Sequence, residues 1–109
     1  MKKTVITALA ALSLSAHAEF MDGNILLQRL TGTEQQQALG VGYIIGSTDT
    51  LMGLTVCAPA NVTASQLTDM VTAFLKANPA VRHKTADSIV NYLFSTAWPC
   101  EQKKKGPNT

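Results

Sequence analysis

Few residues of this chain have the types and spacing that could do chemistry. Its 109 residues contain two cysteines, Cys57 and Cys100, and two histidines, of which only His83 lies outside the N-terminal segment. One histidine cannot build a multi-histidine metal site, and the cysteines lack the Cys-x-x-Cys spacing of a redox pair. No Gly-x-Ser-x-Gly, His-Glu-x-x-His or glycine-rich phosphate motif occurs. We therefore expect no metal, no cofactor and no catalytic centre.

A small hydrolase is a remote alternative. Asp49 and Asp69 could act as a glycosidase pair, and His83 could serve a serine nucleophile. Scattered acids in a short chain more often cap helices or stay solvated. Asn61-Val62-Thr63 matches a glycosylation acceptor, but a helix cap is a sufficient role for Thr63.

The first 18 residues are typical of a secretory signal peptide. Met1-Lys2-Lys3 is basic, residues 4–15 form an uncharged and largely apolar run, and Ala16-His17-Ala18 is a small-x-small cleavage pattern. The alternative, a membrane anchor, requires about 20 apolar residues. We predict cleavage after Ala18, export to the periplasm of a Gram-negative cell, or of a host cell if the gene is phage-borne, and no stable membrane insertion.

Cleavage removes the apparent basicity. The remaining 91 residues carry seven Lys and Arg against seven Asp and Glu, so there is no electrostatic footprint for nucleic acid. Residues 19–100 are predicted to form one domain. Residues 101–109 contain Lys103-Lys104-Lys105 and nothing apolar, and we predict a disordered basic tail. Contact of these lysines with anionic lipid or peptidoglycan is the alternative.

The hydrophobic pattern predicts an all-α fold, a small bundle of about four helices. A short first helix should follow Asp22-Gly23 and end at Thr31-Gly32. A later helix should begin at a capping box of Thr63 and Gln66 and end at Asn78-Pro79, and the last should end at Trp98-Pro99. The apolar stripes of these last two helices are Leu67, Met70, Val71, Phe74 and Leu75, then Ala86, Ile89, Val90, Leu93, Phe94 and Ala97.

The second helix should be capped by Thr33 and run from Glu34 to about Leu54. Its apolar side would carry Ala38, Val41, Ile45 and Met52. Gly42, Gly46 and Gly53 lie near one line of this helix and would let another helix approach closely; the alternative is that they mark a loop or a kink. Asp49 falls on the same line, and we expect it within ion-pair reach of Arg82 or His83.

In an oxidising compartment the two cysteines permit one connectivity, Cys57 with Cys100. If the last two helices are antiparallel neighbours, the start of one lies beside the end of the other. The bridge would enclose 44 residues and join these two helices.

An ordered series of short motifs runs from about Phe20 to Cys100, and in this series the chain resembles the Rap/Tai family of immunity proteins. The motifs are Gly23-Asn24-Ile25-Leu26-Leu27, Gly42-Tyr43-Ile44-Ile45-Gly46 with Asp49, Cys57-Ala58-Pro59, Val62-Thr63 with Gln66-Leu67, Asn78-Pro79, Arg82-His83 and Trp98-Pro99-Cys100.

The resemblance implies a small, periplasmic, all-helical protein that catalyses nothing. Characterised members bind type VI secreted peptidoglycan amidases, which are cysteine amidases, and protect the cell; related inhibitors are often dimers, so a homodimer is also implied. Many relatives carry a second cysteine pair, where this chain has Leu30 and Gly40. The absence of both cysteines of this pair is consistent with the loss of one whole disulfide. It should leave the N-terminal half of the domain less tightly fixed.

Arg82, His83 and Lys84 form a cationic turn that is a candidate for partner binding, with Tyr43 as a further candidate. The structural alternatives are that Arg82 and His83 satisfy carbonyls at the helix junction and that Tyr43 is a half-buried packing residue. The alternative functions are a periplasmic holdase and a phage-borne inhibitor of another cell-wall enzyme.

Overall fold

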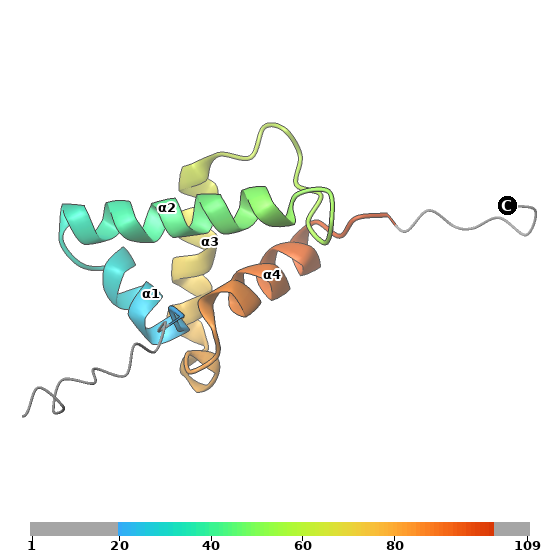
Figure 1. Ribbon diagram of the computed structural model, residues 1–109. Helices are drawn as coiled ribbons and strands as arrows, with labels where there is room; N and C mark the ends of the chain where they lie inside the picture. The colour runs from blue at the N-terminus through green and yellow to red at the C-terminus, as the bar shows by residue number, and fades with distance from the viewer. Residues whose placement is uncertain (1–19, 102–109) are drawn as a thin grey trace, which may run out of the picture.

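The computed structural model describes residues 20–101 and confirms an all-α fold (Figure 1). The predicted signal peptide and residues 102–109 of the predicted tail lie outside the described residues. Within residues 20–101 the extended backbone makes only isolated bridges, with no strand. The elements are α1 (Gly23–Leu30), α2 (Glu34–Leu51), α3 (Ala64–Ala77), the 3-10 helix η2 (Pro79–Val81) and α4 (Ala86–Ala97).

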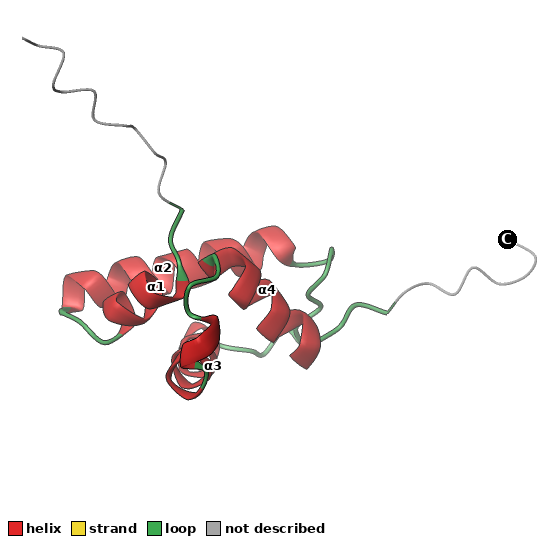
Figure 2. Cartoon of the chain, turned by 90° about the horizontal axis from the view of Figure 1, so that it is seen from below, coloured by secondary structure: helices red, strands yellow, loops and turns green. Residues whose placement is uncertain are grey.

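Helices α1, α2 and α4 form one layer, and α3 packs across it. Figure 2 shows α3 nearly end-on at one side of the other three helices. The core lies where the four helices meet, and Leu26 of α1, Ile44 of α2, Val71 of α3 and Phe94 of α4 have no exposed surface. Each helix therefore contributes a fully buried side chain to one common core.

The helix starts follow from residues next to them in the chain. Asp22 accepts a hydrogen bond of 2.8 Å from the Ile25 N–H at the start of α1. Thr33 and Gln36 form a complete, reciprocal capping box at α2. At α3 the Thr63 hydroxyl accepts a hydrogen bond of 3.1 Å from the Gln66 N–H, as predicted. The reciprocal bond from the Thr63 N–H to the Gln66 side chain is not formed there.

The predicted faces of α3 and α4 are confirmed. Leu67, Val71 and Leu75 of α3 are buried, with Met70 and Phe74 half-buried beside them. In α4 the buried residues are Ala86, Ile89, Val90 and Phe94, whereas Ala97, at the end of the predicted stripe, is exposed.

The predicted face of α2 is wrong. Gly40, Ile44 and Thr48 are buried. Of the predicted stripe, Val41 is half-buried against the core, whereas Ala38, Ile45 and Met52 are exposed. Apolar residues occur on every side of this helix, so its sequence has almost no amphipathic direction. Its inner face is therefore set by packing against the other helices, and the buried Thr48 hydroxyl satisfies itself by donating to the Ile44 carbonyl at 2.7 Å.

The predicted close helix approach along the glycine line is also wrong. A Cβ added at Gly42, Gly46 or Gly53 would meet no atom within 4 Å. Gly53 lies just after α2, which ends at Leu51 rather than near Leu54, and has a φ of 82°, so the loop alternative holds there. The glycines at which a Cβ would meet close neighbours are instead Gly23, Gly32 and Gly40.

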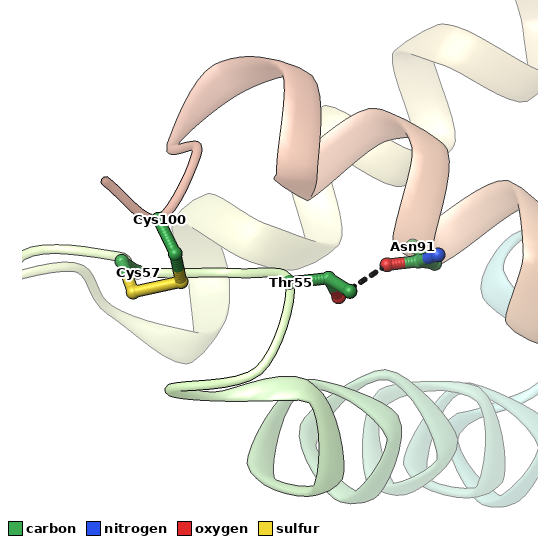
Figure 3. Close-up of a disulfide and its surroundings, with 4 residues drawn as sticks. All are labelled: Thr55, Cys57, Asn91 and Cys100. Carbon is green, nitrogen blue, oxygen red and sulfur yellow. Dashed lines mark hydrogen bonds between the residues drawn. A yellow bond between two sulfur atoms is a disulfide. The ribbon is translucent and has the colours of Figure 1, made fainter. Parts of the chain in front are cut away.

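The Cys57–Cys100 disulfide is confirmed, with the two Cα atoms 4.9 Å apart (Figure 3). Beside it, the Cys57 N–H donates to the Trp98 carbonyl at 2.8 Å, and Val56 pairs with Pro99 in an isolated bridge. The chain between the two cysteines contains α3 and α4. The disulfide itself joins the segment after α2 to the segment after α4. The expected antiparallel pairing of α3 and α4 is not its cause, because α4 contacts α2 more extensively than α3.

Candidate functional site

The cationic turn lies between η2 and α4 and is fixed to the start of α1 by backbone hydrogen bonds. The Gly23 N–H donates to the Lys84 carbonyl and the Asn24 N–H to the Arg82 carbonyl, both at 3.0 Å. A Cβ at Gly23 would stand 2.9 Å from the Arg82 carbonyl oxygen, so only glycine allows this approach. The turn is therefore held in place by a segment that lies 58 to 61 residues earlier in the chain.

The Arg82 side chain belongs to the end of α3. Its Nε donates to the Leu75 carbonyl at 2.6 Å, and its second terminal nitrogen donates to the Lys76 carbonyl at 3.3 Å. These carbonyls have no partner within the helix, and a cation there also complements the helix dipole. The structural alternative for Arg82 is confirmed.

The expected ion pair between Asp49 and this turn is not formed. Asp49 is exposed and lines a groove with Val62, Ala64 and Leu67, at the start of α3. Arg82 lies at the opposite end of α3, which has 14 residues and is thus about 21 Å long. Thr63, beside this groove, has the capping role described above.

His83 and Lys84 are exposed, and Lys84 lies at the rim of a groove between α3 and α4. We call this the α3–α4 groove; it has a volume of about 560 Å³. Its lining residues are Phe74, Asn78, Val81, Lys84, Ser88, Ile89 and Tyr92. A groove with apolar walls and a cation at its rim suits a protein side chain or segment better than a metal or a polar cofactor.

Tyr92 is the residue of this groove that sequence reasoning missed. It is 61% exposed, and its ring lies 6.1 Å from the ring of Phe74, centroid to centroid. The available signal was an aromatic residue within the otherwise polar outer face of α4, next to Asn91. Exposed tyrosines are enriched among the residues that dominate binding energy at interfaces.

Tyr43 is half-buried on α2 and packs against the core. Burial raises the pKa of its phenol above the ordinary value of 10.0, and the Asp87 carboxylate raises this pKa further; polar contacts with Ser47 and with the Asp87 backbone oppose the shift. Tyr43 is thus placed against the first turn of α4, which directly follows the cationic turn in the chain. It has less exposed surface than Tyr92.

Residues 20–101 were compared with the requirements of a metal site and of a membrane span, and they meet neither. No group of three or more His, Cys, Asp or Glu side chains is placed to hold a metal ion. No helix in the described part of the chain combines the length and the apolar character needed to cross a membrane.

Comparison with known protein families gives a match over most of the chain. The model of the family described as Rap1a immunity proteins matches residues 22–100, which include all four helices, the disulfide and the cationic turn. Comparison with curated proteins gives no match.

Proposed function

This chain belongs to the Rap1a immunity protein family, and on that premise we propose that it acts in the periplasm by binding and inhibiting a secreted peptidoglycan amidase. The observation that carries the proposal is the family match over residues 22–100, because it spans the whole described domain. The family's description refers to immunity, which supports a role in binding an effector. The signal-peptide pattern of residues 1–18 supports a periplasmic site of action.

The surface we propose for the amidase is the end of the domain that carries the cationic turn. His83, Lys84 and Tyr92 are exposed there, around the α3–α4 groove. A standard interface needs roughly 800 Å² per partner, and its energy is concentrated in a few central residues. A protruding turn beside a groove can supply such a centre, with Tyr43 at its margin.

The experiment that tests this function is inhibition of amidase enzymes encoded beside the gene. The mature protein, residues 19–109, is titrated into each purified amidase, and release of the peptide from peptidoglycan is measured together with direct binding by calorimetry. We expect stoichiometric inhibition of one amidase. A protein that inhibits none of them but keeps unfolded periplasmic clients soluble is a holdase, and the proposal is then wrong.

We also propose that the protein forms a homodimer through the outer face of α2. On this face Leu39 is 58% exposed beside the open Gly42 and Gly46. Ile45, 38% exposed, lies at the edge of the face, where it also lines the groove that contains Asp49. Exposed apolar side chains beside small residues form a surface that a second helix can approach closely.

Sedimentation equilibrium of the mature protein tests the dimer. Gly46→Gln adds a bulky side chain where the monomer has open space, so it should weaken association without affecting the fold. A wild-type monomer at high concentration would rule out the dimer and leave the inhibitor proposal untouched.

A further inference from the structure

The residues that line the α3–α4 groove indicate which kind of ligand it binds. Its walls carry Phe74, Val81 and Ile89, and the exposed Tyr92 extends the aromatic surface of Phe74 outward. Its volume of about 560 Å³ is sufficient for one or two large side chains. The interior therefore favours an apolar side chain, because burial there removes apolar surface of both partners from water.

The charge at the rim adds a second requirement. Lys84 is the charged residue among the lining residues, and His83 precedes it on the same exposed turn. The carboxylate nearest in the chain, Asp87, lines a different depression with Ser47 and Thr50 on the α2 side of α4. A positive rim beside an apolar interior attracts a partner segment that carries a carboxylate next to an apolar side chain.

A second apolar groove of the domain has the opposite charge. Between α2 and α3, Ile45, Met52 and Ala58 line a groove of about 430 Å³, and its charged residue is Asp49. The two grooves therefore differ in the sign of the charge that they would select, although both are apolar.

We propose that the α3–α4 groove binds an acidic–apolar segment of the inhibited enzyme: an apolar side chain packs in the groove against the Phe74–Tyr92 aromatic pair, and an adjacent carboxylate pairs with Lys84. This inference rests on the proposed function for the identity of the partner. The recognition chemistry itself is a property of the groove, so it can be tested with and without the enzyme.

The first experiment needs no enzyme. Two blocked tetrapeptides, Asp-Leu-Phe-Asp and Lys-Leu-Phe-Lys, are titrated into the mature protein, and backbone amide shifts are followed by NMR. We expect the acidic peptide to shift the amides of the α3–α4 groove with an affinity at least fivefold above that of the basic peptide. Lys84→Glu should abolish this preference. Equal binding of both peptides, shifts confined to the α2–α3 groove, or no shift at all would overturn the proposal.

The second experiment uses the inhibited amidase and a matched pair of charge reversals. Lys84→Glu should weaken binding at least tenfold, and Tyr92→Ala should do the same. Lys76→Glu is the control, because Lys76 is an exposed lysine of α3 that does not line the groove and its reversal changes the net charge equally. It should change the dissociation constant less than threefold.

The outcomes separate this inference from the proposed function. If the wild type inhibits an amidase and both Lys84→Glu and Tyr92→Ala bind it as the wild type does, the groove proposal is wrong and the inhibitor stands. If no amidase binds, the inhibitor proposal fails, and the peptide titration still decides what the groove accepts.

Discussion

The guanidinium of Arg82 donates a hydrogen bond of 2.6 Å to the carbonyl oxygen of Leu75. The first residue of the cationic turn therefore completes the last turn of α3, while its two neighbours, His83 and Lys84, are exposed. One short run of basic residues thus contains a side chain bound to α3 and two exposed side chains, and substitution can separate their effects.

Arg82→Ala should lower the free energy of unfolding by about 1–3 kcal/mol, because two carbonyls at the end of α3 lose a charged donor. Lys84→Ala should change it by less than about 0.5 kcal/mol, since the side chain is exposed. Urea unfolding followed by circular dichroism measures both. Equal, small effects would mean that water replaces the Arg82 contacts at little cost.

Two alanine substitutions should have opposite signs. Gly46→Ala should raise stability by about 0.5–1 kcal/mol, because alanine favours the helix and its Cβ meets open space. Gly23→Ala should lower stability by about 1–3 kcal/mol, because its Cβ would stand 2.9 Å from the Arg82 carbonyl oxygen. Thermal unfolding of the two variants checks the signs, and destabilisation by Gly46→Ala would contradict the open outer face of α2.

Leu30 and Gly40 lie in contact, and a disulfide should form between cysteines placed there. A Cβ at Gly40 would be 3.3 Å from the Leu30 Cγ, and a cysteine at position 30 would place its sulfur near this Cγ position, close enough for a disulfide to form. The resemblance places the second cysteine pair of many relatives at these positions. Mass spectrometry of unreduced Leu30→Cys/Gly40→Cys should show two intramolecular bridges, and two free thiols would show that α1 and α2 are spaced too far apart.

Loss of the native disulfide should lower the free energy of unfolding by several kcal/mol. The bridge joins residues 43 apart, and the loop-entropy relation gives about 4 kcal/mol for this closure. Cys57→Ser/Cys100→Ser should therefore show a lower urea midpoint with nearly native helix content. An unchanged midpoint would mean that contacts between the turn after α2 and α4, such as the 2.6 Å hydrogen bond that the Thr55 hydroxyl donates to Asn91, hold these segments together without the disulfide (Figure 3).

The raised pKa of Tyr43 should make stability fall at high pH. Above pH 10.0 the unfolded phenol loses its proton first, while the folded state retains it, so the stabilisation declines as pH rises through the folded pKa. Asp87→Asn should lower the pKa of Tyr43, leaving the part of the elevation that burial causes. Phenolate absorbance measures the pKa of Tyr43 in a Tyr92→Phe background. This background is needed because the chain has two tyrosines and their absorbance would overlap.

The sequence by itself determined what depends on neighbouring residues. The caps at Asp22, Thr33 and Thr63 and the helix stops at Asn78 and Trp98 act within one turn of the chain, so short motifs predict them. The inner faces of α3 and α4 were predictable because each has one apolar stripe. The cysteine pair was predictable because an even pair permits one connectivity.

Tertiary structure alone decided the rotation of α2, the role of Arg82 and the groove beside Tyr92. Apolar residues surround α2, so only packing against α1, α3 and α4 selects Ile44 and Thr48 as its inner face and turns Gly42 and Gly46 outward. The groove exists because α3 crosses the layer of the other helices and α4 diverges from it, which exposes Tyr92 beside Phe74. Such relationships depend on how whole helices are placed relative to one another. This placement is determined by the sum of many small contact energies, so no short sequence motif encodes it.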